Sequence, residues 1–192
     1  MHHLAIFASG SGTNAENIAL KLRNEPQIKV SCICTNRPDA LVIERSKKLG
    51  IPYLVFNRDD FYHRSTVIDH LIDLQVEWII LAGFLWLVPN TLINAFPGKI
   101  INIHPALLPA YGGKGMYGHH VHKSVIEAGE KWSGITIHYI DNEYDRGNII
   151  FQAKCPVLPD DTPDSLASRI HQLEYEHYPE VIKQVVLENN AL

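Results

Sequence analysis

Asn102 and His104 are the two residues of this chain best placed to do chemistry. They interrupt an isoleucine-rich run, and because they stand two positions apart, both side chains leave the same face of a strand. Pro105 ends that strand and places the pair at its carboxyl end, where open α/β sheets bind their ligands. An amide beside an imidazole suits the stabilisation of an oxyanion and the movement of a proton, although the pair could instead form a hydrogen bond within the core.

A third group is needed to orient or charge the imidazole. The loop over residues 141–147 offers three carboxylates, Asp141, Glu143 and Asp145. Their spacing alone does not choose among them, and acidic loop residues are commonly just solvated.

Three histidines lie close together at positions 119, 120 and 122. Zinc sites use other spacings and usually add a cysteine or carboxylate ligand, which no motif nearby supplies. We therefore predict that the chain holds no metal.

The segment Ser9-Gly10-Ser11-Gly12-Thr13-Asn14 lies between an apolar run and a helical pattern. The glycines permit a tight turn and a close backbone approach to a ligand, while Thr13 and Asn14 present caps and free N–H groups where the helix begins. The segment therefore predicts a phosphate site.

Two other interpretations of this turn stay open. Gly10, Gly12 and Ala15 also fit a relaxed dinucleotide fingerprint, and Arg37, after the second strand, could accept the 2′-phosphate of NADP. The segment could also be a strand-to-helix turn without a ligand.

Strand and helix patterns alternate through the first hundred residues. Strands are expected over residues 4–8, 29–34, 53–56, 78–82 and 100–103. Helices are expected over residues 14–23, 39–49 and 60–74, with a short one near Pro89. Strands that are apolar on both faces indicate a parallel sheet covered by helices.

The pattern changes after residue 105. A glycine-rich loop over 111–118 precedes a helix at 121–128, extended segments at 134–140 and 149–155, and a last helix from about 163 to 188. Pro179 is expected to break that helix. We predict one α/β domain over residues 1–192, with a Rossmann-like parallel sheet and a mixed or antiparallel C-terminal portion.

Composition favours an ordinary globular protein. Formal charge is −4 and no basic run is present, so a nucleic-acid surface is not expected. No apolar segment approaches the length needed to span a bilayer, and the first residues do not resemble a signal peptide. We predict a cytoplasmic enzyme that acts on small molecules, without nucleic-acid or membrane partners, as a monomer or homodimer.

The run Asn102-Ile103-His104-Pro105-Ala106-Leu107-Leu108-Pro109 resembles the signature of the folate-dependent formyltransferases. Leu81-Ala82-Gly83-Phe84 before it, and Asp145 with Gly147 after it, resemble other landmarks of that family. The resemblance covers essentially the whole chain. It implies transfer of a formyl group from 10-formyltetrahydrofolate, a co-substrate, to the amine of glycinamide ribonucleotide, the third step of purine synthesis.

The resemblance also implies roles for particular residues. Asn102, His104 and Asp145 would be the catalytic group. The substrate phosphate would lie on Gly12, Thr13 and Asn14, with Glu174 holding the ribose and Arg64 near the substrate. The folate would lie against residues 81–88 and 140–145, and the contacts expected there are Leu85, Trp86, Leu87, Val88, Ile140 and Asp141.

Competing functions predict different features. A formyltetrahydrofolate hydrolase would carry a regulatory domain, and a methionyl-tRNA formyltransferase would carry an RNA-binding domain. A sugar-nucleotide formyltransferase explains the phosphate turn less well. An NADP oxidoreductase would leave Asn102, His104 and Asp145 without a role, and a nucleotide sensor would show no turnover.

Overall fold

Seven strands form one sheet in the computed structural model, which describes residues 1–141 and 145–188. The strands are β1 (His2–Phe7), β2 (Ile28–Thr35), β3 (Tyr53–Val55), β4 (Trp78–Leu81), β5 (Ile100–His104), β6 (Trp132–Tyr139) and β7 (Ile149–Pro156). Their order is β3-β2-β1-β4-β5-β6-β7. The first five are parallel, and β6 and β7 are antiparallel. The α/β class with an antiparallel C-terminal portion is thus confirmed.

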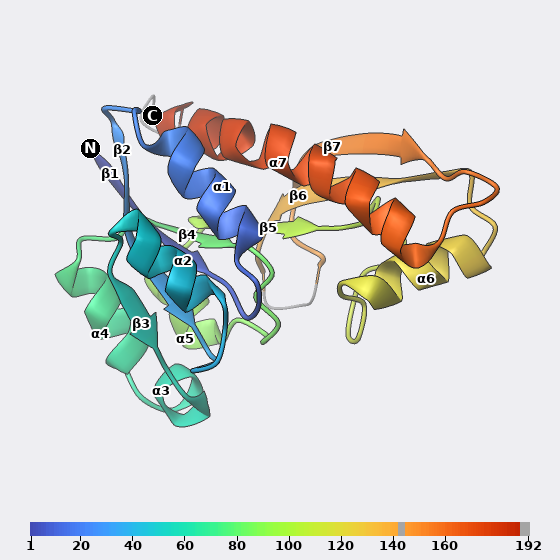
Figure 1. Cartoon of the computed structure of the whole chain (residues 1–192). Helices are drawn as coiled ribbons and strands as arrows, with labels where there is room; N and C mark the ends of the chain where they lie inside the picture. The colour runs from blue at the N-terminus through green and yellow to red at the C-terminus, as the bar shows by residue number, and fades with distance from the viewer. Residues whose placement is uncertain (142–144, 189–192) are drawn as a thin grey trace.

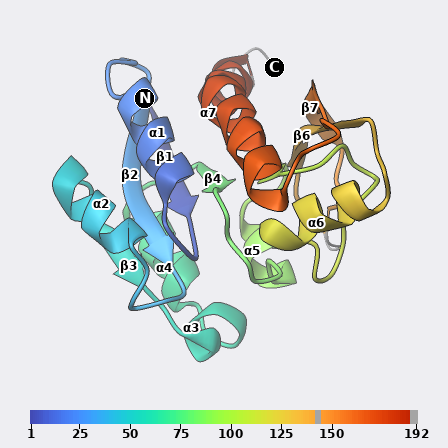
Figure 2. The same ribbon diagram turned by 45° about the vertical axis from the view of Figure 1, so that its right-hand side comes forward.

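Helices cover both faces of the sheet (Figures 1 and 2). They are α1 (Thr13–Leu22), α2 (Val42–Leu49), α3 (Arg58–Tyr62), α4 (Thr66–Asp73), α5 (Asn90–Ala95), α6 (His119–Glu127) and α7 (Pro163–Glu188). One apolar cluster joins α1, α6 and α7 to the sheet, and a second joins α3, α4 and α5 to its other face. None of the helices in the described part of the chain is both long and apolar enough to cross a membrane.

The strands supply apolar side chains to both clusters. Leu4 and Ile6 of β1 belong to the first cluster, whereas Ala5 and Phe7 belong to the second. Alternate residues of a strand point to opposite faces, so a strand between two helical layers must be apolar throughout. This is why the central strands lack the polar alternation of a sheet with one wet face.

The prediction of a single helix over residues 60–74 is wrong. Two helices stand there, α3 and α4. Asn57 caps α3 in a capping box with Asp60, and the N–H groups of His63 and Arg64 both bond to the Asp59 carbonyl, which ends the helix. The apolar positions fall on two separate turns, Phe61 and then Val67 with Leu71, and the spacing alone did not reveal the interruption.

The break expected at Pro179 is also wrong, because α7 continues through it. Proline has no N–H to donate to the carbonyl of Tyr175, four residues earlier. The side chain of Asn17, on α1, donates to that carbonyl instead, at 2.9 Å. A donor from the neighbouring helix therefore replaces the missing bond, and α1 and α7 lie side by side (Figure 2).

The strand order reverses direction between β1 and β4, since β2 and β3 lie on one side and β5 on the other. At such a switch point the loops after the two central strands separate and leave a crevice. The N–H of Ser9 bonds to the Gly83 carbonyl at 3.0 Å, and the N–H of Leu85 to Ser9 Oγ at 3.0 Å. These bonds fix the floor of the crevice.

Candidate active site

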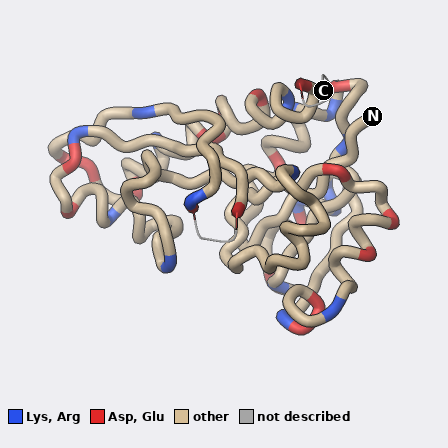
Figure 3. The backbone as a smooth tube through the Cα atoms, turned by 180° about the vertical axis from the view of Figure 1, so that it is seen from behind, with Lys and Arg blue, Asp and Glu red and all other residues tan. Residues whose placement is uncertain are grey.

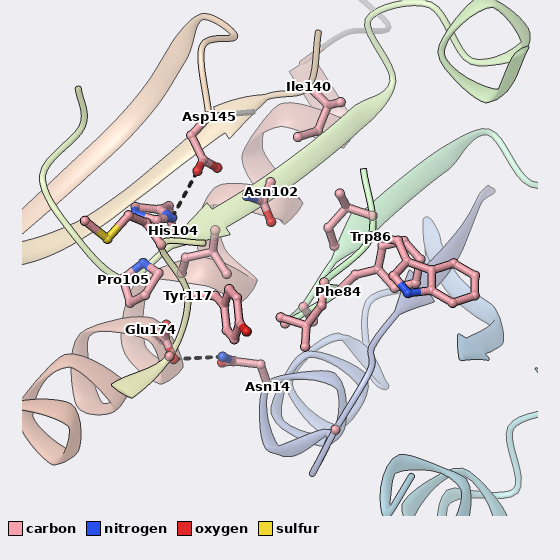
Figure 4. Close-up of a pocket in the computed structure, with 18 of the residues that line it drawn as sticks. Asn14, Phe84, Trp86, Asn102, His104, Pro105, Tyr117, Ile140, Asp145 and Glu174 are labelled. Atoms are coloured by element: carbon pink, nitrogen blue, oxygen red, sulfur yellow. Dashed lines mark hydrogen bonds and ion pairs between the residues drawn. The ribbon is translucent and has the colours of Figure 1, made fainter. Parts of the chain in front are cut away.

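A cavity of about 620 Å³ opens at the carboxyl ends of β1, β4 and β5. It receives residues from the turn after β1, the loop after β4, the end of β5 and the glycine-rich loop before α6. The α7 helix closes one side with His171 and Glu174 (Figure 4). Most of the predicted site residues line this cavity: Gly12, Thr13, Asn14, Leu85, Trp86, Leu87, Val88, Asn102, His104, Ile140, Asp141, Asp145 and Glu174.

Asn102 and His104 lie together at the cavity from β5. The amide of Asn102 contacts His138 of β6, with Nδ2 and Nε2 3.1 Å apart. Nδ1 of His138 lies 2.9 Å from the Tyr139 carbonyl and donates to it, which fixes the orientation of the ring. His138 thus holds the Asn102 amide in a defined orientation.

His104 is 4% exposed and lies between two acceptors. Its Nε2 is 2.8 Å from the carbonyl oxygen of Tyr111, and its Nδ1 is 3.6 Å from Oδ2 of Asp145. Burial lowers the pKa of His104 below its ordinary value, while the Asp145 carboxylate and the Tyr111 carbonyl work in the opposite direction. Because the carbonyl and the carboxylate only accept, a neutral ring can donate to one of them, whereas the imidazolium, with a hydrogen on each nitrogen, can donate to both.

Asp145 faces both histidines (Figure 4 shows its pairing with His104). Its Oδ1 lies 3.6 Å from Nε2 of His138, and its Oδ2 accepts the N–H of Gly113 at 3.0 Å. Burial alone would raise the pKa of Asp145, but the contacts with His138, His104 and Gly113 outweigh it and hold the pKa below its usual value. Asp145 is therefore ionised at neutral pH.

The turn after β1 meets α7 at the other end of the cavity. Gly12, rather than Thr13 or Asn14, is the N-cap of α1, and no side chain caps the helix. The first helical N–H with a backbone partner is that of Glu16, so the N–H groups of residues 13–15 lie free of the helix ladder. Gly12 has φ +73°, and a Cβ there would collide with the side chain and backbone of Val42, which explains why glycine stands here.

Glu174 is 5% exposed and accepts a hydrogen bond from Nδ2 of Asn14 at 2.8 Å. Burial raises the pKa of Glu174, against the lowering effect of Asn14 and of nearby His171. Oδ1 of Asn14 is buried and has no hydrogen-bond partner among the described residues. The Asn14 side chain therefore carries one polar atom without a partner beside the cavity.

The loop after β4 forms the opposite wall. Leu85, Trp86, Leu87 and Val88 line it, with Ile140 and Asp141 beside them. The Tyr62 hydroxyl donates to the Leu87 carbonyl at 3.0 Å, and Trp86 packs against the rings of Phe56, Phe61 and Phe84. An apolar wall held from behind in this way fits a flat aromatic ligand.

Some predicted residues lie elsewhere. Arg64 is outside the cavity lining, with a side chain 66% exposed that pairs with Asp59 at 2.6 Å. Glu143 lies outside the described residues. Of the three clustered histidines, only His122 lines the cavity, and within residues 1–141 and 145–188 no group of histidine, cysteine and carboxylate side chains could hold a metal ion.

Sequence reasoning missed His138 and Tyr111, and it considered His122 only as a possible metal ligand. A signal for His138 exists, because Thr136 and His138 alternate in an apolar strand as Asn102 and His104 do. The antiparallel register places His138 opposite Asn102. Tyr111 acts through its main chain, for which a sequence gives no signal.

The fold and the site define a class of enzyme. The model of the formyl transferase family matches residues 2–182, so the chain belongs to that family. Within that family, the chain is similar to proteins named phosphoribosylglycinamide formyltransferase.

Two relatives carry that name. The chloroplastic protein of Arabidopsis thaliana is 42% identical over 185 residues, which are 93% of this chain and 63% of the plant protein. The protein of Bacillus subtilis is 39% identical over 195 residues, 99% of this chain and 97% of the relative. This chain thus spans less than two thirds of the plant protein and almost all of the bacterial one.

Solved structures agree. The glycinamide ribonucleotide transformylase 1 of Geobacillus kaustophilus has a TM-score of 0.88 at 38% identity, covering 96% of this chain and 98% of that one. The phosphoribosylglycinamide formyltransferase of Streptococcus pneumoniae has a TM-score of 0.86 at 36% identity, covering 97% and 99%.

Proposed function

We propose that this protein transfers the formyl group of 10-formyltetrahydrofolate to the amine of glycinamide ribonucleotide. The observation that carries the proposal is one continuous cavity with Asn102, His104 and Asp145 at its centre. The turn after β1 stands at one end and the apolar wall of residues 85–88 at the other. Relatives named for this reaction support it.

The two ends suit the two substrates. The N–H groups at the start of α1 and the carboxyl of Glu174 suit the phosphate and ribose hydroxyls of a ribonucleotide. The wall at residues 85–88 suits the pterin: the N–H groups of Trp86, Leu87 and Val88 make no backbone hydrogen bond to a described residue. The folate supplies an activated formyl carbon between them.

The chemistry follows from the central group. The substrate amine attacks the formyl carbon. Asn102 donates a hydrogen bond to the formyl oxygen as it becomes negative, and the positive charge of protonated His104 stabilises that oxygen. Asp145 favours the charged form of His104 against the effect of burial. With water, it passes the proton lost by the amine toward the folate nitrogen, whose bond to the formyl carbon then breaks. Formylated ribonucleotide and tetrahydrofolate result.

An absorbance assay with 10-formyl-5,8-dideazafolate tests the proposal. Release of the deformylated folate should require glycinamide ribonucleotide and fall sharply in His104→Ala, with the exposed His63→Ala as control. Asp145→Asn should lower kcat far more than it raises KM. Release without an acceptor would indicate a hydrolase instead, and an absence of release would return NADP to consideration.

We further propose that the protein is a single domain over residues 1–192 and acts in the cytoplasm as a monomer or homodimer. Light scattering on the purified protein measures its mass in solution. A tetramer or larger species would contradict the proposal of a monomer or homodimer.

A further inference from the structure

Tyr111 has an unusual backbone beside the active site. Its φ is +56°, a left-handed conformation that is unfavourable for a residue with a side chain. In this conformation its carbonyl oxygen reaches Nε2 of His104 at 2.8 Å. Strained residues of this kind gather at functional sites when the surrounding structure holds them.

Contacts on both sides hold Tyr111 in place. Its hydroxyl donates to Oε1 of Glu130, just beyond α6, at 2.8 Å. The next residue, Gly112, is closely packed: a Cβ there would lie 2.6 Å from Cδ2 of Leu108 and 3.3 Å from Cβ of Asp145, so Leu108 would have to move. Gly113 then donates its N–H to Asp145. The segment 111–113 therefore contacts the imidazole and the carboxylate together.

The Tyr111 carbonyl decides which nitrogen of His104 is available. A carbonyl only accepts, so Nε2 carries a hydrogen in both the neutral and the charged ring. Nδ1, which faces Asp145, is then the nitrogen that gains and loses the proton. We propose that Tyr111 is a positioning residue that fixes this assignment, with the hydroxyl–Glu130 hydrogen bond keeping its carbonyl on His104.

The charges around His104 make this contact consequential. Asp145 favours the imidazolium, whereas His138 of β6 opposes it. His122 of α6 also faces this region, and burial together with neighbouring histidines, His104 among them, lowers its pKa to about 4. Because burial lowers the pKa of His104, loss of the carbonyl contact lowers it further and reduces the charged fraction at neutral pH.

Three variants separate positioning from folding. Tyr111→Phe and Glu130→Ala remove the hydroxyl contact, and Glu130→Gln keeps an acceptor oxygen. Tyr53→Phe, at an exposed tyrosine of β3, is the matched control. Histidine ¹⁵N NMR of each protein reports the protonation of His104 nitrogens, with the resonances assigned from His104→Gln.

We expect Nε2 of His104 to carry the proton in the neutral wild-type ring. In Tyr111→Phe and Glu130→Ala its titration should move to lower pH, and kcat above neutral pH should fall about three- to ten-fold while kcat at acidic pH changes little. Glu130→Gln should restore most of both. A uniform loss of kcat at all pH values, with an unmoved His104 titration, would show a purely structural role.

A neutral His104 protonated on Nδ1 would overturn the proposal directly. The kinetic arm rests on the proposed formyl transfer, but the NMR arm does not. A protein without transferase activity could therefore still show the predicted tautomer. Failure of the proposed formyl transfer is thus distinguishable from failure of the proposed role of Tyr111.

Discussion

Glu174 illustrates a conflict between stability and binding at a single residue. Its carboxyl is buried at the cavity with Asn14 as its one hydrogen-bond donor among the described residues. Burying a charge without full pairing is unfavourable, which is why its pKa is raised. A ligand that donates hydrogen bonds would relieve this cost, so the residue suits binding better than folding.

Glu174→Gln should stabilise the free protein at neutral pH and weaken ribonucleotide binding about ten-fold or more. An acid with a raised folded pKa binds its proton more tightly when folded, so its charge lowers stability once the pH rises above the unfolded value. The stability difference between variant and wild type should therefore grow from acidic to neutral pH in urea unfolding. The exposed Glu176→Gln is the control, and a difference independent of pH would contradict the argument.

His122 gives a pH dependence of the opposite sign. Burial and nearby His171 and His119 lower its pKa to about 4, and its Nδ1 has no hydrogen-bond partner in the described part of the chain. A base with a depressed folded pKa binds protons better when unfolded, so wild-type stability falls as the pH drops from about 6.5 toward 4.

Wild type is expected to lose stability between about pH 6.5 and 4, and His122→Gln should remove up to about 3 kcal/mol of that loss in the free energy of unfolding. The measurement is the free energy of unfolding at several pH values between 4 and 7, with His63→Gln as an exposed comparison. If wild type and His122→Gln lose stability in parallel, His122 is not the group responsible.

At the scale of elements, α7 holds the site together. Glu174 and Tyr178 stand one turn apart on it, and the buried Tyr178 hydroxyl lies 3.0 Å from the Leu81 carbonyl and 3.2 Å from that of Ile101. The helix is thereby attached to β4 and β5 beside the catalytic strand. Their spacing of four residues on the helix is what brings both side chains to one face.

Asn17→Leu should destabilise the protein by about 1–3 kcal/mol, because it leaves the Tyr175 carbonyl without its donor. Pro179→Ala restores a backbone N–H to α7, so the double variant should lose clearly less than Asn17→Leu alone. Urea unfolding of both single variants and the double variant measures this coupling. Additive changes would mean that Asn17 does not replace the missing proline bond.

At the scale of the molecule, the charge distribution bears on how the protein would bind the anionic substrates proposed above. The chain has a formal charge of −4, and basic and acidic residues are interspersed along it (Figure 3). Among the described residues that line the cavity, three are carboxylates and Lys114 alone is a lysine or arginine. Tyr117 of the same loop lines the cavity together with Asn14 and Glu174 (Figure 4).

Lys114→Glu should therefore raise KM for the ribonucleotide at least about ten-fold and leave KM for the folate nearly unchanged. The effect should shrink at high ionic strength, since salt screens exposed charges. Lys123→Glu, an exposed change on α6, controls for net charge. Equal effects of the two substitutions would point to the overall field rather than to Lys114.

Local patterns in the sequence determined much of this protein. Strand and helix periods depend on neighbouring residues, so the alternation of elements, the shared face of Asn102 and His104 and the turn at residues 9–14 were all readable. The resemblance to known formyltransferases then selected Asp145 from three carboxylates that spacing could not separate.

The tertiary structure alone decided the contacts between distant segments. His138 meets Asn102 through the register of β5 and β6, Tyr111 meets His104 through a left-handed backbone, and Asn17 carries α7 past Pro179. Each contact joins groups whose approach depends on how the chain returns to the same place. Hydrogen bonds are satisfied by whichever partner the topology supplies, and a local pattern does not contain that partner.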